Sequence, residues 1–209
     1  MVTNSPIINI MNTTIAYYNS HAQEYIDKTR DLDDCRTADY FLSLLPHSAR
    51  ILDFGCGSGK DLKYFRDHGF RAEGTDGSDE ICYRASQYTG TKVRKLGFLD
   101  LGDLESFDGI WARASIMHLK RSELPVVFYR MCNALVDGGI IYTSFPYGNF
   151  EGMKNGCWYT YMDENRIRKI TDSINKLSIE DAWFSRDARS EETQITWMNL
   201  ILRKGTRHT

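Results

Sequence analysis

The sequence predicts an α/β protein built on a doubly wound parallel sheet, and three observations carry this prediction. From residue 50 onward, short apolar runs typical of strands alternate with segments of helical periodicity. The first apolar run leads directly into a glycine-rich turn and a helix-like segment. The second run ends close to Asp76, about twenty residues beyond the turn. In open α/β sheets ligands bind at the carboxyl ends of the strands, so the turn and Asp76 are expected to face one crevice.

The expected elements follow one another along the chain in alternating order. Strands are expected at residues 50–54, 71–75, 92–96, 107–112, 140–145, 177–184 and 193–203. Helices are expected at residues 60–65, 78–88, 121–136 and 163–175. The helix over 121–136 ends at two consecutive glycines, a common stop signal. The last two strands follow each other without a helix between them, which predicts a hairpin-like pair at one edge of a seven-stranded sheet.

Two further helices are expected before the sheet, at residues 12–28 and 33–45. A chain of 209 residues is long enough to bury one full core, and no repeat or low-complexity linker divides it. We therefore expect a single domain over residues 1–209, with a helical cap at 1–45 and the sheet-containing core at 46–209. The cap helices must pack on the sheet or cover the crevice.

The composition of the chain indicates which kinds of binding partner and which cellular compartment to expect for this protein. The net charge of −2 provides no electrostatic footprint for nucleic acid, so a nucleic-acid partner is not expected. No segment approaches the ~18 apolar residues of a membrane span, and the amino terminus lacks a signal-peptide pattern. Five scattered cysteines without metal-type spacing indicate reduced thiols and no metal site. These features predict a cytoplasmic protein; they carry no information on its oligomeric state.

The glycine-rich turn lies in the stretch RILDFGCGSGKD, residues 50–61. Gly55, Gly57 and Gly59 alternate with small residues, and glycine permits positive φ and close approach of a ligand to the backbone. The helix that follows turns its free N–H groups toward this turn. Cys56 lies inside the turn without a histidine neighbour in sequence, so it is interpreted as a small filler and not as a nucleophile.

Two nucleotide-type interpretations of the turn fail on its flanking residues. A P-loop requires Ser or Thr after the lysine, but Lys60 is followed by Asp61, and Phe54 stands where its first glycine belongs. A dinucleotide fingerprint requires a third glycine where this chain has Lys60. Asp53, directly before the turn, would also repel a pyrophosphate. A ligand that carries an ammonium group suits this carboxylate better.

S-adenosylmethionine (SAM) carries such an ammonium, and its ribose requires a second carboxylate. Asp76 is placed to accept hydrogen bonds from both ribose hydroxyls. The alternative is that Asp76 caps the following helix, but Ser78, followed by Glu80, is the better cap. The pattern ILDFGCGSG resembles the start of the cofactor site in class I SAM-dependent methyltransferases. The resemblance implies SAM as cofactor and S-adenosylhomocysteine (SAH) as product.

Two loops complete the expected cofactor site. In GFLDLGD, Asp100 is expected to accept from the adenine amine while Phe98 and Leu99 pack on the ring; the alternatives are an Asx-turn at Asp100, or Asp103 in its place. The segment after the fourth strand, residues 111–119, is expected to run beside the methionine part of SAM. The candidate cofactor-binding residues are Asp53, Gly55, Cys56, Gly57, Gly59, Asp61, Asp76, Gly77, Ser78, Phe98, Leu99, Asp100, Ala114, Ser115, His118 and Tyr25.

The likeness extends through FDGIWARASIMHL, LPVVFYRMCNALVDGGIIYTSFPYG and NGCWYTYMDE. These segments, with the leader TIAYYNSHAQEY, resemble a bacterial group of small class I methyltransferases described as methyltransferase-domain or tellurite-resistance-like proteins. The resemblance implies a seven-stranded, doubly wound, Rossmann-like methyltransferase sheet with N-terminal cap helices. Pro146 and Cys157 replace a lysine and an arginine of that group's pattern. Either the acceptor is less acidic here, or those cations are surface charges.

Residues for the methyl acceptor and for catalysis are expected around the mouth of the crevice. His118 is a candidate base, with the alternative that its ring only shapes the loop. Arg113 is expected to meet an acidic acceptor or the cofactor carboxylate, or to be a solvated charge. Tyr17 is the second catalytic candidate. The candidate substrate residues are Tyr18, His21, Arg113, Tyr147, Trp158 and Tyr161.

The predicted reaction is methyl transfer from SAM to an N, O or S atom of a small molecule. An acceptor in tRNA or protein is the second possibility, to which the basic segments 166–169 and 203–208 give weak support. The third possibility is a catalytically silent module that binds SAM or SAH.

Overall fold

The computed structural model describes residues 10–32, 35–187 and 195–206. Its main feature is a seven-stranded sheet in the order β3-β2-β1-β4-β5-β9-β8. The first five of these strands pair in parallel, and β9 runs antiparallel to both β5 and β8. The strand bounds are β1 Arg50–Phe54, β2 Arg71–Asp76, β3 Arg94–Lys95, β4 Phe107–Ala112, β5 Leu135–Pro146, β8 Leu177–Arg186 and β9 Thr196–Lys204. The predicted seven-stranded α/β sheet with a terminal antiparallel pair is confirmed.

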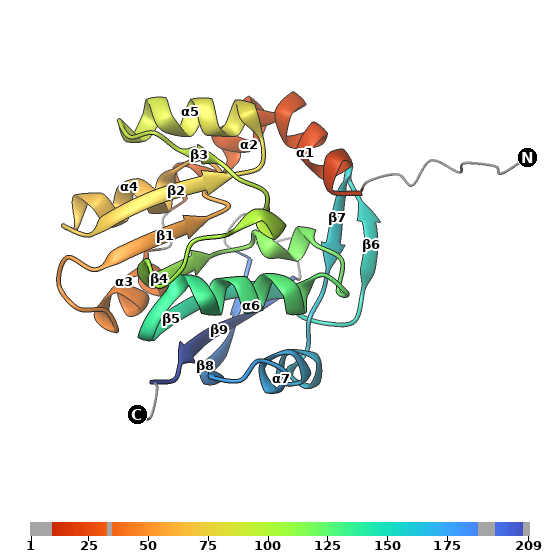
Figure 1. The fold of residues 1–209 in the computed structure, drawn as a ribbon. Coiled ribbons are helices and arrows are strands. Elements are labelled where there is room, and N and C mark those ends of the chain that lie inside the picture. The colour runs from red at the N-terminus through yellow and green to blue at the C-terminus, as the bar shows by residue number, and fades with distance from the viewer. Residues whose placement is uncertain (1–9, 33–34, 188–194, 207–209) are drawn as a thin grey trace, which may run out of the picture.

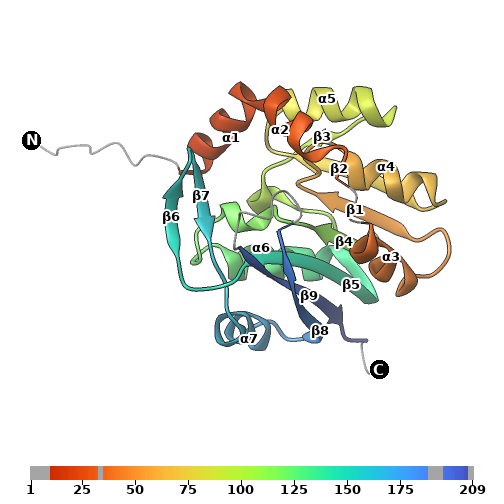
Figure 2. The same ribbon diagram turned by 180° about the vertical axis from the view of Figure 1, so that it is seen from behind.

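Helices cover both faces of this sheet (Figures 1 and 2). The α-helices are α1 Ile10–Ser20, α2 Ala22–Thr29, α3 Arg36–Ser43, α4 Lys60–Asp67, α5 Asp79–Thr89, α6 Leu124–Ala134 and α7 Glu164–Asp172. Side chains of α3, α4 and α5 share one buried cluster with one face of the sheet, and α6 and α7 share another cluster with the opposite face. Two short 3₁₀ helices, η1 Phe98–Asp100 and η2 Ile116–His118, lie in the loops that follow β3 and β4. No helix in the described part of the chain combines the length and apolarity needed to cross a bilayer.

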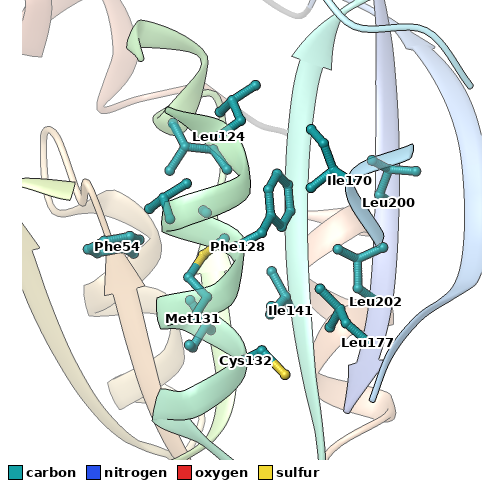
Figure 3. Close-up of a cluster of buried hydrophobic side chains, with 14 of the residues drawn as sticks. Phe54, Leu124, Phe128, Met131, Cys132, Ile141, Ile170, Leu177, Leu200 and Leu202 are labelled. Carbon is teal, nitrogen blue, oxygen red and sulfur yellow. The ribbon is translucent and has the colours of Figure 1, made fainter. Parts of the chain in front are cut away.

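Helix α6 shows how the sequence pattern produces the core (Figure 3). Leu124, Phe128 and Met131 recur at helical spacing, so they form one apolar stripe that faces the sheet. They pack in one cluster with Ile141 of β5 and Leu202 of β9. All five side chains are fully buried, and each such burial stabilises the fold by ~1.5–3 kcal/mol.

The N-terminal helical region differs from the prediction at one point. The helix expected over residues 12–28 is interrupted at His21, which separates α1 from α2. The Ser20 hydroxyl donates to the backbone carbonyl oxygens of Ala16 and Tyr17. His21 Nδ1 also lies 3.0 Å from the backbone carbonyl oxygen of Tyr17. Side chains that bind the carbonyls of the preceding turn compete with regular helix hydrogen bonds. Beyond the break, Ala22 and Ile26 of α2 pack with Ile81 of α5.

A hairpin that the sequence analysis did not predict follows β5. Its strands are β6 Glu151–Lys154 and β7 Cys157–Thr160. Asn155 and Gly156 connect them, both with positive φ (51° and 82°), as a two-residue hairpin turn requires. The Asn-Gly pair is the local signal that predicts such a turn. The hairpin stands beside α1, as Figure 1 shows, and its β7 strand lies against η2.

Three boundaries also differ from those predicted. Strand β3 has only two residues, α6 ends at Ala134, and β5 begins directly after it at Leu135. The glycines at 138 and 139 therefore lie inside a strand and do not end a helix. Residues 33–34 and 193–194, part of the predicted second cap helix and last strand, lie outside the described residues.

Candidate active site

Two adjoining cavities open at the carboxyl-terminal edge of the sheet. The β2 cavity lies at the end of β2 and is lined by Asp76, Ile81, Leu96 and Phe98, among others. The β5 cavity lies over the ends of β1, β5 and β9 and is lined by Asp53, Asp61, Tyr142 and Asn199, among others. Both cavities share the walls formed by Tyr18, Tyr25, Gly55, Arg113 and Ala114. A ligand with two dissimilar halves can therefore occupy both.

The glycine turn forms the floor between the two cavities. Gly55 and Gly57 have φ values of 82° and 52°, which disfavour any side chain. A Cβ on Gly57 would lie 2.5 Å from the Tyr25 hydroxyl, and one on Gly55 would lie 2.6 Å from Ser115 Cβ. Gly59 instead faces Thr89 and Ala85, so it joins α4 to α5 and lines neither cavity.

Substitution of Gly57 by alanine is expected to lower both the stability and the affinity for a ligand of the turn. The left-handed backbone costs ~1–2 kcal/mol with a side chain, and the contact with Tyr25 adds ~1–3 kcal/mol. Gly90→Ala is the matched control, because Gly90 has φ 66° but open space around its Cα. Urea unfolding should show a smaller loss of stability for Gly90→Ala than for Gly57→Ala. Equal losses would show that Tyr25 does not constrain the turn.

Asp76 lies at the end of β2 with its carboxylate turned back to the glycine turn. It accepts hydrogen bonds from the Gly57 N–H at 3.2 Å and the Ser78 N–H at 2.9 Å. Burial raises the pKa of Asp76 to about 6, and the N–H groups of Ser78, Gly57 and Gly77 oppose that rise. Ser78 caps α5 through its own hydroxyl, which accepts from the Ile81 N–H. Asp76 is therefore not needed as the cap, and its carboxylate lines the β2 cavity.

Asp53 is a buried carboxyl group on the wall of the β5 cavity, only 3% exposed. Within the described residues its Oδ2 has no hydrogen-bond partner. Burial raises the pKa of Asp53 well above its ordinary value, and the charges of Asp61 and Asp76 add to the rise. A cationic ligand group at this position would relieve the cost of ionising Asp53.

Asp61 lies in the first turn of α4 and faces the same cavity. Its carboxylate accepts from the Trp111 indole N–H at 2.9 Å and lies 3.6 Å from the Arg113 guanidinium. Burial raises the pKa of Asp61, against the charge of Lys60 and the hydrogen bond from Trp111. Arg113 is thus held at the junction of the two cavities by a carboxylate of the glycine-turn segment.

His118 is 5% exposed and joins the N-terminal cap to the hairpin. Its Nδ1 lies 2.7 Å from the Trp158 carbonyl oxygen, so Nδ1 carries the proton and donates. In neutral histidine Nε2 is then an acceptor, and the Tyr18 hydroxyl, 3.0 Å away, donates to it. The pair of Tyr18 and His118 therefore has a defined direction of hydrogen bonding at the wall of the β2 cavity.

Most of the predicted cofactor residues meet at these cavities. Those on the walls of the β2 cavity are Tyr25, Gly55, Gly57, Asp76, Gly77, Ser78, Phe98, Ala114, Ser115 and His118. Those on the walls of the β5 cavity are Tyr25, Asp53, Gly55, Cys56, Asp61 and Ala114. Burial raises the pKa of the Cys56 thiol well above its ordinary value, consistent with its interpretation as a filler. Two of the predicted substrate residues, Tyr18 and Arg113, line both cavities.

Two predicted adenine contacts are not brought to either cavity. Leu99 packs against the main hydrophobic cluster, and Asp100 is exposed, because η1 turns both away while Phe98 faces inward. Phe98 packs edge-on against Phe54, with ring centroids 5.1 Å apart. The competitor Asp103 pairs with Arg94 at 3.1 Å.

Five residues that were predicted to be catalytic or to bind the substrate lie outside the two cavities. Tyr17 packs against Gly156 of the hairpin turn and stacks on His21, because the helix directs Tyr18, and not Tyr17, toward the sheet. Tyr147 donates to Glu164, and Tyr161 packs on Phe150. Trp158 contributes its carbonyl to His118, while its indole N–H donates to Thr160. None of these five side chains lines either cavity.

The sequence analysis missed the polar residues of the β5 cavity that come from the last strands of the sheet. Tyr142 and Ser144 of β5, Ser185 of β8 and Asn199 of β9 line this cavity. A signal for one of them was present: Asn199 interrupts the apolar run WMNLIL, and a buried amide in a strand requires partners. Across the described residues, no three His, Cys, Asp or Glu side chains gather in an arrangement that would hold a metal ion.

This sheet order and glycine turn define the Rossmann-like fold of class I SAM-dependent methyltransferases. The chain belongs to the methyltransferase-domain family, whose model matches residues 18–187. No curated protein matches the sequence.

Three solved structures show the same fold. The 1,6-didemethyltoxoflavin N1-methyltransferase of Burkholderia thailandensis, solved with its substrate and SAH, has a TM-score of 0.76 and 19% identity, over 97% of this chain and 93% of that one. Magnesium protoporphyrin IX methyltransferase of Synechocystis PCC 6803, solved with SAM, has a TM-score of 0.72 and 18% identity, over 96% and 100%. A TehB-like SAM-dependent methyltransferase of Corynebacterium glutamicum has a TM-score of 0.71 and 20% identity, over 88% and 98%.

Proposed function

We propose that this protein transfers the methyl group of SAM to an N, O or S atom of a small molecule. The observation that carries the proposal is the arrangement around the glycine turn. A buried Asp53 oxygen without a partner among the described residues lies on one side, and the Asp76 carboxylate lies on the other. The ammonium group of the methionine part of SAM and the diol of its ribose need these two acceptors.

The residues present fit SAM group by group. Asp76 would accept the ribose hydroxyls, and Ile81, Leu96 and Phe98 provide an apolar slot for the adenine. Asp53 would pair with the ammonium group. Burial raises the pKa of Asp53, and a cation beside the carboxylate would offset the cost of ionising it. When bound, SAM supplies an electrophilic methyl on a sulfonium centre. The glycine turn supplies the close backbone approach and excludes side chains from this position.

Tyr18 and His118 are the candidate proton carriers. Burial raises the pKa of Tyr18 well above its ordinary value, so the phenol stays neutral. When the Tyr18 oxygen takes a proton from a methyl acceptor, Tyr18 must therefore give its own hydroxyl proton to His118 Nε2. The Trp158 carbonyl holds Nδ1 in the tautomer that makes this transfer possible. This pair replaces the predicted pair of His118 and Tyr17.

A small acceptor is supported by the way the N-terminal cap covers the cavities. Tyr18 and Tyr25 of α1 and α2 wall both cavities, and Asn19 joins α1 to the start of α5 by accepting from the Ser78 hydroxyl at 2.6 Å. Two structural neighbours, by their names, methylate a small heterocycle and a porphyrin.

The test is incubation of the protein with methyl-labelled SAM and separate small-molecule, RNA and protein fractions of a cell extract. Label is expected in one or a few small molecules, identified by mass spectrometry. Label confined to RNA or protein would contradict the small-molecule proposal. The absence of label from all three fractions, with SAH binding intact, would favour the silent binding module.

The affinity of the protein for SAM and SAH is expected to fall as the pH is lowered, because Asp76 then becomes protonated. Its pKa of about 6 in the free protein means that lowering the pH through 6 protonates the carboxylate and removes an acceptor for the ribose hydroxyls. SAH affinity measured by calorimetry should be about tenfold weaker at pH 5 than at pH 7. The raised pKa of Asp53 acts in the same direction. An affinity that rises toward pH 5 would exclude ionised carboxylates as the ligands of the cofactor.

A further inference from the structure

A continuous line of hydrogen bonds crosses the floor of the β5 cavity, over the ends of β5, β9 and β8. On β5, where the line begins, the Ala114 N–H donates to Ser144 Oγ at 2.9 Å. Tyr142 and Asn199 Oδ1 are 2.8 Å apart, and Asn199 Nδ2 and Ser185 Oγ are 2.9 Å apart. Ser144, Tyr142 and Asn199 are each at most 3% exposed, so the line is buried until it reaches Ser185.

The orientation of the Asn199 amide is determined by its surroundings. The carbonyl oxygens of Trp183 and Trp197 both lie 3.4 Å from Nδ2. A carbonyl oxygen only accepts, so the amide nitrogen, and not its oxygen, must face these two groups. Oδ1 is consequently the atom that faces Tyr142.

The direction of every bond in the line then follows. Because Oδ1 only accepts, Tyr142 must donate its single hydroxyl hydrogen to Asn199. At the other end Nδ2 only donates, so Ser185 Oγ accepts from it. Ser185 keeps its own hydroxyl hydrogen to donate.

The Ser185 hydrogen is directed to the cavity. Ser185 lines the β5 cavity, and within residues 10–32, 35–187 and 195–206 no protein group accepts a hydrogen bond from it. Buried polar lines of this kind are costly in a strand interior unless all members are satisfied. A ligand that accepts a hydrogen bond from the Ser185 hydroxyl would complete the line.

We propose that this one-way line, from Tyr142 through Asn199 to Ser185, is a specificity subsite that donates a hydrogen bond to the methyl acceptor. The acceptor molecule then carries a carbonyl-type oxygen or an unprotonated ring nitrogen at this position. Trp197 and Tyr159, which also line the cavity, suit a flat molecule. The subsite rests on the proposed function for its role, because it places this group of the acceptor beside the cofactor.

The test uses two flat, neutral probes of opposite polarity, quinoline and indole. Quinoline accepts a hydrogen bond at its ring nitrogen, and indole donates one. The protein is first saturated with SAH, whose calorimetric titration reports the proposed cofactor site separately. Dissociation constants for each probe are then measured by ligand-observed NMR. The native protein is expected to bind quinoline about tenfold more tightly than indole.

Two variants and a control decide the outcome. Ser185→Ala should abolish the preference and bring the two constants together. Asn199→Ala removes the amide N–H that orients Ser185, so the preference should weaken and the two constants should approach each other. Ser178→Ala, an exposed serine at the other end of β8, should retain the native ratio. Equal affinities in the native protein, no quinoline binding, or an unchanged ratio in Ser185→Ala would overturn the subsite while leaving the SAH result intact.

Discussion

Replacement of Asp76 by alanine is expected to weaken SAM and SAH binding about 100-fold. Hydrogen bonds to a carboxylate contribute ~1.5–3 kcal/mol each, so two at the lower end of this range contribute ~3 kcal/mol, which corresponds to a factor of about 100 or slightly more. The carboxylate is half-buried in the β2 cavity, where solvent does not replace those bonds fully. Isothermal calorimetry with SAH measures the effect without knowledge of the methyl acceptor.

Two comparisons make this result specific. Asp79→Asn is the matched control, because Asp79 lies three residues away, is exposed and pairs with Lys95, at 2.7 Å. It should bind SAH like the native protein. Asp76→Ala also leaves the N–H groups of Gly57 and Ser78 without their acceptor, so urea unfolding must be measured beside binding. A folded Asp76→Ala protein with native SAH affinity would exclude Asp76 as the ribose ligand.

Tyr18→Phe is expected to slow label transfer from SAM about 100-fold, with a much smaller effect on SAH affinity. General acid–base groups typically contribute 10²–10⁴-fold, and the substitution removes the only hydroxyl that donates to His118 Nε2 among the described residues. The phenyl ring still fills the wall between the cavities. Initial rates with labelled SAM and the small-molecule fraction measure this change.

The neighbouring tyrosine provides the control. Tyr17→Phe should retain the native rate, because the Tyr17 ring packs on Gly156 and His21, outside both cavities. His118→Gln should slow transfer to a similar degree as Tyr18→Phe, and the double variant should be no slower than either single one. Equal rates for Tyr17→Phe and Tyr18→Phe would contradict a role for the pair in proton transfer.

The sequence analysis left open which face of the first helix turns toward the sheet, and so whether Tyr17 or Tyr18 faces the cavities. Both tyrosines lie on α1, and their spacings to His21 and Tyr25 allow either face to meet the cofactor. The contacts of α1 with β7 and α5 decide which face turns inward. The Trp158 N–H donates to Thr14 at 3.0 Å, and this bond fixes the rotation of the helix. That contact joins residues 144 positions apart, so no local pattern contains it.

The sequence by itself determined the part of the site that we propose for the cofactor. Asp53, the glycine turn and Asp76 lie within one strand–turn–helix–strand unit, so local backbone preferences place them together whatever the rest of the chain does. The turn needs positive φ, which the glycines supply, and a ribose needs a carboxylate, which Asp76 supplies at the end of the second strand. Both features can be recognised in the sequence alone.

Only the tertiary structure decided the part of the site that we propose for the methyl acceptor. Tyr18 meets His118 across 100 residues of chain, and Tyr142 meets Asn199 across 57. These pairs depend on the antiparallel return of β9 beside β5 and on the seating of α1 against the hairpin. Side chains so far apart in sequence are brought together by packing and strand register, which single-residue preferences do not encode.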